Sequence, residues 1–269
     1  MGKVILVVSD ALRDDTARQQ MGYLQHLVEA GKATRYTVIA ELPTMSRPLY
    51  ETLHTGVPVS VHGVTNNLVV RRSIMPNVFE EAVKRGRTTG ASAYGWFSEL
   101  YNRAPYDRVA DRETDDVGSG IQHGRFYMED NMPDREVFAA GASVIHKFGP
   151  DYVLIHPMGM DYLGETYGAD SPEYRNNAIF QDMALANLIP GWLERGYTVL
   201  VTADHGINND KLHGGTLPDV RHVPLYWIPT DGLGRGDSGR QVAQLSIAPT
   251  LCRLLELPIP QTMQSPPLD

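Results

Sequence analysis

Short, almost continuous apolar runs recur along the chain, and longer amphipathic stretches separate them. Five runs have the length and composition of buried strands: Val4–Val8, Tyr36–Ala40, Thr89–Ala93, Tyr152–His156 and Thr198–Thr202. Helical periodicity fills the intervals, over Asp14–Ala30, Arg47–Thr55, Met75–Arg85, Asp134–Lys147, Pro172–Arg195 and Ser246–Leu255. Apolar strands that alternate with helices predict an α/β fold, with a mostly parallel central sheet and helices on both of its faces.

A single domain over residues 1–269 accounts for the whole chain. Hydrophobic residues make up 42% of the sequence, enough for a sizeable core. The stretch 94–133 is less regular and rich in Tyr, Arg, Asp and Gly, and we expect an insertion there. It would be a lid or substrate-recognition segment, or else a solvated insertion with no special role. The tail Gln261–Asp269, which contains Pro266-Pro267, is expected to be loosely ordered.

Chemically reactive side chains follow four of the five predicted strands. Asp10 comes directly after the first, Asp161 lies shortly after the fourth, and Asp204-His205 follows the fifth. The second strand leads within a few residues to Ser46. Because ligands bind beyond the carboxyl ends of parallel strands, we expect these four positions to contribute to one site.

Two of these side chains, Asp204 and His205, combine with the nearby His213 into a potential set of metal ligands. Asp204, His205 and His213 offer one carboxylate and two imidazoles, donors that suit Zn²⁺. An isolated Asp-His-Gly triplet could equally be a structural loop. Combined with Asp10 and Asp161 at the ends of other strands, it predicts a metal site.

Ser46 stands where a helix should begin, because Pro48 falls in the first turn. Ser46 could simply be the N-cap of this helix. A hydroxyl at a helix N-terminus also lies in the positive field of the helix dipole, which favours an alkoxide, and coordination to a metal would favour it further. The position therefore predicts a nucleophile as well as a cap.

Charge and composition narrow the range of partners. The net charge of −8 argues against binding to a nucleic-acid polymer, and a small anionic substrate would need the positive charge of bound metal ions. The sequence shows no charged leader and no run of about 18 apolar residues, so we expect no membrane attachment and a cytoplasmic location. Cys252 is the only cysteine, which excludes an internal disulfide and a cysteine-based zinc site.

A series of short motifs spans nearly the whole chain. They are Asp10, Pro43-Thr44-Met45-Ser46-Arg47-Pro48, Thr52-Leu53-His54-Thr55-Gly56, His62-Gly63-Val64-Thr65-Asn66-Asn67, Asp204-His205-Gly206, His213-Gly214-Gly215, Val223-Pro224-Leu225 and Ser246-Ile247-Ala248-Pro249-Thr250-Leu251. In this order they resemble the alkaline phosphatase superfamily, above all its type I phosphodiesterase/nucleotide pyrophosphatase branch. The resemblance implies an alkaline-phosphatase-like three-layer sandwich. It also implies a metal-dependent hydrolase of phosphate esters, first of all phosphodiesters or nucleotide pyrophosphates.

Residue-by-residue matching implies two divalent metal ions and a covalent phosphoseryl-type intermediate. Asp10, Asp204 and His205 would hold one ion, and Ser46 would be the nucleophile that bridges to it. The other ion would be held by Asp161, Glu165 and His213. The match also implies that the Asn67 amide donates to a non-bridging phosphoryl oxygen in the transition state. The alternative for Asn67 is a turn residue after Gly63.

The chain departs from the branch pattern at a few of the motif positions. Glu165 replaces the histidine of the family's D-x-x-G-H motif, so Zn²⁺ is expected but Mn²⁺, Mg²⁺ or Fe²⁺ are alternatives. Glu165 could instead be a solvated helix-start residue. The usual asparagine and histidine after Pro48 become Leu49-Tyr50, which alters the wall of the leaving-group pocket. Arg47 and Tyr50 are candidate substrate contacts, although Arg47 could equally point into solvent.

Other functions on the same scaffold remain open. A phosphomonoesterase or a phosphonate hydrolase is the first alternative, and Arg47 is the only nearby cation that could serve a monoester. A sulfatase is disfavoured because Tyr50 replaces the arginine of the sulfatase maturation motif. A metal-dependent phosphoglycerate mutase would need a large inserted domain. A non-catalytic binding protein on a hydrolase scaffold is the alternative from a different class.

Overall fold

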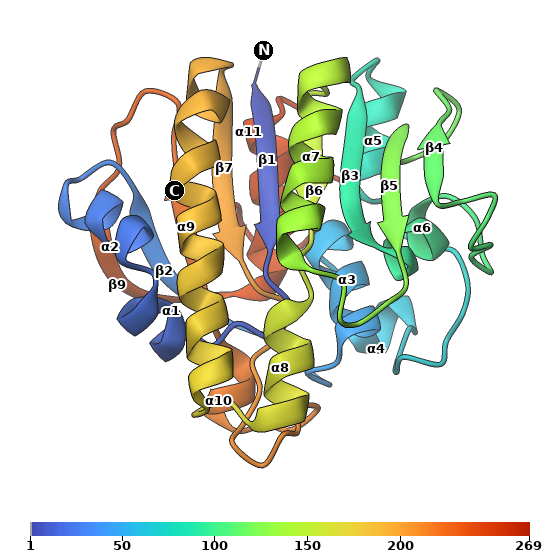
Figure 1. The fold of residues 1–269 in the computed structure, drawn as a ribbon. Coiled ribbons are helices and arrows are strands. Elements are labelled where there is room, and N and C mark those ends of the chain that lie inside the picture. The colour runs from blue at the N-terminus through green and yellow to red at the C-terminus, as the bar shows by residue number, and fades with distance from the viewer. Residues whose placement is uncertain (1) are drawn as a thin grey trace.

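One mixed sheet of nine strands runs through the centre of the molecule. The structure is a computed structural model and describes residues 2–269. The strands are β1 (Lys3–Val8), β2 (Thr34–Ile39), β3 (Thr89–Tyr94), β4 (Glu113–Asp115), β5 (His123–Tyr127), β6 (Tyr152–Ile155), β7 (Tyr197–Thr202), β8 (His222–Ile228) and β9 (Gly236–Ala243). Their spatial order is β4-β5-β3-β6-β1-β7-β8-β2-β9 (Figure 1).

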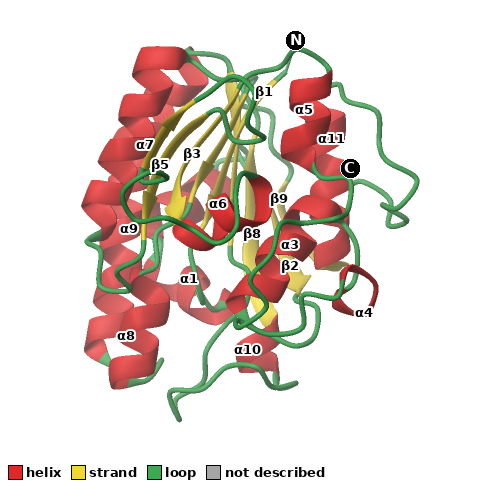
Figure 2. Ribbon diagram, turned by 90° about the vertical axis from the view of Figure 1, so that its right-hand side faces the viewer, coloured by secondary structure: helices red, strands yellow, loops and turns green. Residues whose placement is uncertain are grey.

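Helices cover both faces of this sheet. They are α1 (Asp14–Gln20), α2 (Gly22–Glu29), α3 (Ser46–Thr55), α4 (Val59–His62), α5 (Val78–Lys84), α6 (Gly95–Tyr101), α7 (Asp134–Phe148), α8 (Gly159–Tyr167), α9 (Pro172–Glu194), α10 (Pro218–Arg221) and α11 (Ile247–Leu254). Figure 2 shows α7 and α9 on one side of the sheet and α3, α5 and α11 on the other. The chain therefore adopts the predicted three-layer α/β sandwich.

The five predicted strands all form and all run in the same direction. β1 pairs in parallel with both β6 and β7, and β3 pairs in parallel with β6. β8 lies between β7 and β2 and is antiparallel to both, so β2 runs in the same direction as β7. The residues of β1 are buried on both faces after Lys3, as expected for an apolar strand in the middle of a layered fold. All five carboxyl ends thus meet at one edge of the sheet, the lower edge in Figure 1.

Some elements differ from the sequence prediction. The single helix expected over Asp14–Ala30 is two helices, because Met21 leaves the helical region with φ −92° and ψ 74°. The irregular stretch 94–133 contains α6, β4 and β5, and the two strands extend the sheet beyond β3. Its role as a lid or recognition segment stays a prediction.

The C-terminal tail packs against the body of the protein, so the prediction of a loosely ordered tail is wrong. The Leu268 N–H donates to Thr250 Oγ1 at 2.8 Å, and Asp269 forms an ion pair with Arg240 at 2.7 Å. The Tyr36 hydroxyl donates to the carbonyl of Asp269. Pro266 and Pro267 limit the backbone conformations of the tail, but the polar groups of Leu268 and Asp269 still form these hydrogen bonds and this ion pair.

None of the helices within residues 2–269 combines the length and the apolar character needed to cross a bilayer. A cytoplasmic location stays a prediction from the sequence.

A buried histidine supports the helix that begins at Ser46. His54 is fully buried in α3, and its ring stacks on Phe79 with 4.8 Å between the ring centroids. Its Nδ1 lies 3.1 Å from the Tyr50 carbonyl, and its Nε2 lies 2.9 Å from the Tyr152 hydroxyl. Burial lowers the pKa of His54 to about 4, although the hydrogen bond to Tyr50 acts in the opposite direction.

This histidine should make the free energy of unfolding depend on pH. The unfolded chain takes up the proton at an ordinary pKa near 6.5, above the folded value, so stability is present above pH 6.5 and is lost as the pH falls toward 4. Between pH 7 and pH 5 we expect a loss of about 2 kcal/mol from this group. Urea unfolding at the two pH values should show that the His54→Gln variant loses correspondingly less than the wild type. The control is His26→Gln, at an exposed histidine, which should keep the wild-type difference. Equal pH dependence in wild type and His54→Gln would contradict the prediction.

Candidate active site

The predicted site residues meet at the carboxyl edge of the sheet. Asp10 follows β1, and Asp204 and His205 follow β7. Ser46 is the first residue of α3, and Asp161 lies in the first turn of α8. These elements are far apart in sequence, and only the parallel arrangement of the strands brings their ends together.

His205 is the centre of the first group. Its Nε2 lies 3.2 Å from Ser46 Oγ, 3.3 Å from Asp204 Oδ2 and 3.6 Å from Asp10 Oδ1. Asp10, Asp204 and His205 are 0% exposed and Ser46 is 2% exposed, so the group is closed to bulk water in this state. The potential ligand atoms of the two aspartates and His205 lie within 4.8 Å of one another, close enough to share one metal ion.

The second group adjoins the first. Asp161, His205 and His213 also bring their ligand atoms within 4.8 Å of one another. The rings of His205 and His213 stack with 4.3 Å between centroids. His213 Nε2 lies 3.3 Å from Glu165 Oε1 and 3.9 Å from Asp161 Oδ1. Glu165 thus contacts the second group through His213, but its side chain is 53% exposed, unlike the other predicted ligands.

The donor set fits bound cations. Three carboxylate oxygens, Asp10 Oδ1, Asp161 Oδ1 and Asp204 Oδ2, are buried and have no hydrogen-bond partner within residues 2–269. Buried polar atoms are nearly always paired, so unpaired oxygens beside two imidazoles indicate places for metal ions. Burial and the neighbouring carboxylates raise the pKa values of Asp161 and Asp204 well above the usual range. A cation would remove this repulsion.

Both imidazoles present the nitrogen that a metal requires. His205 Nδ1 lies 3.0 Å from the Gly206 carbonyl, and His213 Nδ1 lies 3.0 Å from the Thr44 carbonyl. A carbonyl oxygen can only accept, so each Nδ1 carries a proton, and in the neutral ring each Nε2 keeps its lone pair. Burial and the adjacent His213 lower the pKa of His205 to about 3, which keeps this ring neutral.

Asn67 is oriented by the backbone next to the candidate nucleophile. Its Oδ1 accepts a hydrogen bond from the Arg47 N–H at 3.0 Å. Because the carbonyl half of the amide is occupied in this way, the two N–H donors remain for another acceptor beside Ser46. The role of Asn67 in the transition state stays a prediction.

Arg47 and Tyr50 are placed differently from the expectation that they contact substrate. The Arg47 guanidinium is 2% exposed, forms an ion pair with Glu99 and lies 4.4 Å from the centroid of the Trp96 ring. The Tyr50 side chain is 0% exposed, and its hydroxyl donates to Asp10 Oδ2. Both side chains are directed into the protein because their hydrogen-bond and ion-pair partners are buried there. The sequence next to Arg47 and Tyr50 does not reveal these partners.

Sequence reasoning missed His156, a residue beside Asp10. It is buried directly after β6, and its Nε2 lies 3.2 Å from Asp10 Oδ2. Together with Tyr50 it occupies Oδ2 and leaves Oδ1 of Asp10 unpaired. Burial alone would raise the pKa of Asp10, but the hydrogen bond with His156 and the other polar neighbours outweigh burial and hold this pKa at about 2. The signal was available, because His156 ends one of the predicted strands.

A second missed residue, Asp134, links the elements that carry the site. Its Oδ1 accepts from the N–H of Gly159, the first residue of α8, at 3.0 Å. Its Oδ2 accepts from Asn177 Nδ2 and Gln181 Nε2, both in α9 and both at 2.8 Å. Gln181 Oε1 in turn accepts from the hydroxyl of Ser9, the neighbour of Asp10, at 2.7 Å. One buried carboxylate thus fixes the start of α8 relative to the end of β1.

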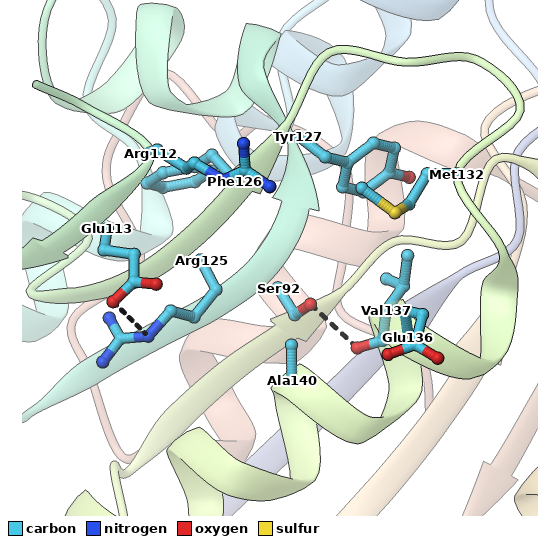
Figure 3. A pocket seen from close by; sticks show the side chains of 10 residues that line it. All are labelled: Ser92, Arg112, Glu113, Arg125, Phe126, Tyr127, Met132, Glu136, Val137 and Ala140. Carbon is cyan, nitrogen blue, oxygen red and sulfur yellow. Dashed lines mark hydrogen bonds and ion pairs between the residues drawn. The ribbon is translucent and has the colours of Figure 1, made fainter. Parts of the chain in front are cut away.

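A pocket of about 220 Å³ lies apart from these groups, between β5 and the first half of α7. Figure 3 shows its lining, in which the Arg125 guanidinium faces the Glu113 carboxylate, 3.8 Å away. None of its lining residues is a predicted site residue. Two of its lining residues contact His156: the Tyr127 hydroxyl donates to the His156 carbonyl at 2.6 Å, and the His156 N–H donates to the Ser92 carbonyl at 2.9 Å.

Comparisons with known proteins agree with this architecture. The family model for type I phosphodiesterase/nucleotide pyrophosphatase matches residues 4–214. GPI ethanolamine phosphate transferase 2 of Candida albicans is 24% identical over 276 residues, covering 96% of this chain and 30% of that protein. The catalytic subunit of human GPI ethanolamine phosphate transferase 2 is 26% identical, with 96% of this chain and 27% of that protein covered. The chain therefore spans less than a third of the length of these two relatives.

Solved structures are similar in fold at low sequence identity. Murine ectonucleotide pyrophosphatase/phosphodiesterase 5 in complex with AMP superposes with a TM-score of 0.74 at 13% identity, covering 96% of each chain. The phosphonate monoester hydrolase from Silicibacter pomeroyi gives 0.69 at 14% identity, covering all of this chain and 76% of the other. These likenesses establish the alkaline-phosphatase-like fold.

The Asp134 network generates a prediction about metal affinity. In the Asp134→Asn variant an N–H₂ group replaces one acceptor, so at least one of the three hydrogen bonds is lost and α8 is less well fixed. We expect the affinity for Zn²⁺ to fall by about 10- to 100-fold, as for other residues that orient metal ligands. Titration of the metal-free protein against a chromophoric zinc chelator measures this.

Asp182→Asn is the matched control. Like Asp134, Asp182 has a buried carboxylate, which here lies on α9. It accepts from the N–H groups of Tyr23 and Leu24, away from the site. This variant should lose stability and keep its zinc affinity. Equal loss of zinc affinity in both variants, or none in Asp134→Asn, would show that the network does not position the site.

Proposed function

The chain belongs to the type I phosphodiesterase/nucleotide pyrophosphatase family, and on this premise we propose that it is a metal-dependent phosphodiesterase in which Ser46 is the nucleophile. The observation that carries the proposal is the position of Ser46 Oγ, 3.2 Å from His205 Nε2 and beside three buried carboxylates with unpaired oxygens. A hydroxyl in such surroundings, at the N-terminus of α3, is suited to attack phosphorus.

Two metal ions complete the proposed site. Asp10, Asp204 and His205 would hold one, next to Ser46, and Asp161, His213 and Glu165 would hold the other. When bound, the two cations favour the Ser46 alkoxide and neutralise charge on the phosphoryl group. The mixture of carboxylates and imidazoles suits Zn²⁺, and Glu165 as a hard oxygen donor widens the choice to Mn²⁺, Mg²⁺ or Fe²⁺.

In the proposed reaction, Ser46 attacks phosphorus and Asn67 stabilises the negative charge that develops on the phosphoryl group. Ser46 Oγ forms a bond to phosphorus while the bond to the leaving alkoxide breaks, which gives a phosphodiester on Ser46. The hydroxyl proton of Ser46 passes to water, and the alkoxide takes up a proton from water and leaves as an alcohol. The Asn67 N–H₂ group donates to a non-bridging oxygen, where negative charge develops. Water then attacks phosphorus, the bond to Ser46 Oγ breaks, and a phosphomonoester is released.

The charge next to Ser46 favours a diester over a monoester. A monoester carries an additional negative charge, and Arg47 was the one nearby cation predicted to meet it. Glu99 neutralises Arg47 in a buried ion pair, so this cation is not available to substrate. A phosphodiesterase is therefore better supported than a phosphomonoesterase.

The relatives support a second candidate, transfer of the phosphoryl group to an alcohol in place of water. Two of them are named for the transfer of ethanolamine phosphate. By this analogy the group retained on Ser46 would be an ethanolamine phosphate, and the acceptor would decide between hydrolysis and transfer.

Replacement of the nucleophile tests the first proposal. The Ser46→Ala variant should lose activity toward bis(p-nitrophenyl) phosphate by roughly 1,000-fold or more, because no group remains to form the covalent intermediate. Its zinc content should stay at the wild-type level. Ser92→Ala, which removes a buried hydroxyl elsewhere in the sheet, should remain active. Full activity in Ser46→Ala would refute the assigned nucleophile. If the wild-type protein shows no turnover in Zn²⁺, Mn²⁺, Mg²⁺ or Fe²⁺, the proposed phosphodiesterase activity is wrong.

Product analysis separates hydrolysis from transfer. With bis(p-nitrophenyl) phosphate in buffer that contains methanol, hydrolysis yields p-nitrophenyl phosphate and transfer yields methyl p-nitrophenyl phosphate. We expect the hydrolysis product to dominate the ³¹P NMR spectrum, because half-exposed Glu165 leaves the second group accessible to water. A ratio of methyl ester to hydrolysis product far above the molar ratio of methanol to water would instead establish a transferase.

A further inference from the structure

A buried carboxyl group on α3 contacts both ends of the segment that carries Asn67. This segment, the Asn67 loop, consists of residues 63–73 and follows α4. Glu51 is 0% exposed, and its Oε1 accepts from the hydroxyl of Ser73, the last residue of the loop, at 2.8 Å. Its Oε2 lies 3.5 Å from Nδ1 of His62, the residue before the loop. One side chain thus lies between the start and the end of the Asn67 loop.

The Asn67 loop returns to the start of the same helix. Asn67 Oδ1 accepts from the N–H of Arg47, the residue after Ser46 in the first turn of α3, at 3.0 Å. Leu68, the next residue of the loop, is 88% exposed, so hydrophobic packing does not hold its side chain. Polar contacts with α3, from Arg47 and from Glu51, therefore help to fix the Asn67 amide beside the candidate nucleophile.

The hydrogen bonds of His62 identify which of its ring nitrogens carries the proton. The Val64 N–H donates to His62 Nδ1 at 3.1 Å, so Nδ1 keeps its lone pair. His62 Nε2 lies 3.0 Å from Thr52 Oγ1, whose hydroxyl donates to the Val57 carbonyl at 3.2 Å, so Nε2 is the donor to Thr52. Burial lowers the pKa of His62 to about 4, which keeps this ring neutral.

No donor or cation compensates a negative charge on Glu51 Oε2. This oxygen is buried, faces the lone pair of His62 Nδ1 and has no hydrogen-bond partner within residues 2–269. Arg71 is the nearby cation, but its guanidinium donates to two backbone carbonyls and forms no ion pair in the described part of the chain. The Tyr101 hydroxyl, on α6, donates to a backbone carbonyl of α3 at 2.9 Å.

A neutral carboxylic acid fits these surroundings better than a carboxylate. Burial raises the pKa of Glu51, although the hydrogen bond from Ser73 and the charge of Arg71 act in the opposite direction. A carboxylate would be buried beside a lone pair and without an ion-pair partner, which is unfavourable. In the acid, the proton on Oε2 lies between this oxygen and the imidazole and removes the repulsion.

We propose that Glu51 is a positioning residue, a neutral carboxylic acid that links both ends of the Asn67 loop to α3. Its Oε1 accepts from Ser73, and its Oε2–H is directed toward His62 Nδ1. The inference rests on the proposed phosphodiesterase, in which Asn67 stabilises the charge that develops in the transition state. Displacement of the Asn67 amide then slows the chemical step more than it weakens the binding of substrate.

Replacement of Glu51 by an amide and by an apolar side chain tests the proposal. Glu51→Gln keeps an acceptor for Ser73 and an N–H donor for His62, so kcat for bis(p-nitrophenyl) phosphate should stay within about twofold of wild type. Glu51→Leu removes both contacts, and kcat should fall by about 10- to 100-fold while KM changes by less than about twofold. Peptides that cover residues 63–73 should also exchange their amide hydrogens about 10-fold faster in Glu51→Leu, measured by mass spectrometry.

Ser73→Ala removes only one of the two contacts and is the second variant, because Glu51→Leu could prevent folding. It should lower kcat and speed up exchange in the Asn67 loop in the same direction as Glu51→Leu, by smaller factors.

Thr55→Val is the matched control, because it removes a buried hydrogen bond of the same helix that does not involve the Asn67 loop. Thr55 Oγ1 donates to the Glu51 carbonyl at 2.7 Å. The variant should lose stability and keep the wild-type kcat and the wild-type exchange of residues 63–73. Equal acceleration of this exchange in Thr55→Val and Glu51→Leu would overturn the positioning role.

The remaining outcomes separate the positioning role from the proposed function. An equal loss of kcat in Glu51→Gln and Glu51→Leu would overturn the neutral acid, since the charge of Glu51 would then be required. Wild-type exchange in both Glu51→Leu and Ser73→Ala, or faster exchange with unchanged kcat, would overturn the positioning role while the phosphodiesterase stands. A wild-type protein without turnover would contradict the phosphodiesterase, and exchange in the variants would still decide whether Glu51 holds the loop.

Discussion

The repulsion among three buried carboxylates is the constraint on which the rest of the structure depends. Asp10, Asp161 and Asp204 lie within two overlapping groups around His205, and each has an oxygen that accepts from no donor in the described part of the chain, residues 2–269. Such an arrangement is unfavourable unless cations occupy it, because burial penalises each charge and the charges repel one another. The layered core holds it together: strands whose residues are buried on both faces fix the positions of the carboxylates. Part of the stability of the fold is thus spent on preorganising a cation site.

The two groups of this site differ in burial and in the elements that support them. Asp10, Asp204 and His205 come directly from strand ends and are fully buried. The second half depends on α8 and on the loop that carries His213, and its outermost member, Glu165, is half exposed. α8 packs against α9, and Asp134 fixes its first residue by accepting from the Gly159 N–H. A methyl group at Gly159 would lie 2.4 Å from Asp134 Oδ2, so this contact requires glycine. In the proposed two-metal site, we therefore expect a cation held by the second group to exchange more readily than one held by the first.

The sequence was sufficient for features that depend on local pattern and insufficient for those that depend on distant partners. Apolar runs located β1, β2, β3, β6 and β7, and their ends located the residues that converge. β9 gave no signal because its segment Gly236–Ala243 is almost entirely polar or glycine, and the sheet recruits it through backbone pairing. Because Arg47 directly follows Ser46, the sequence left two alternatives for its side chain, a contact with substrate or exposure to solvent. Its partner Glu99 lies 52 positions away, and nothing near Arg47 in the sequence reveals a buried ion pair.

Neutralisation of Arg47 has a consequence for the kind of substrate that the site can attract. The chain carries a net charge of −8, and its own cation next to the nucleophile is cancelled by Glu99. An anionic substrate thus meets long-range repulsion from the protein, and in the proposed site only bound cations would attract it. This repulsion is weaker for a diester, which carries one negative charge on its phosphate, than for a monoester, which carries up to two. The net charge of the chain and the buried Arg47–Glu99 pair therefore both favour a diester as the substrate of the proposed reaction.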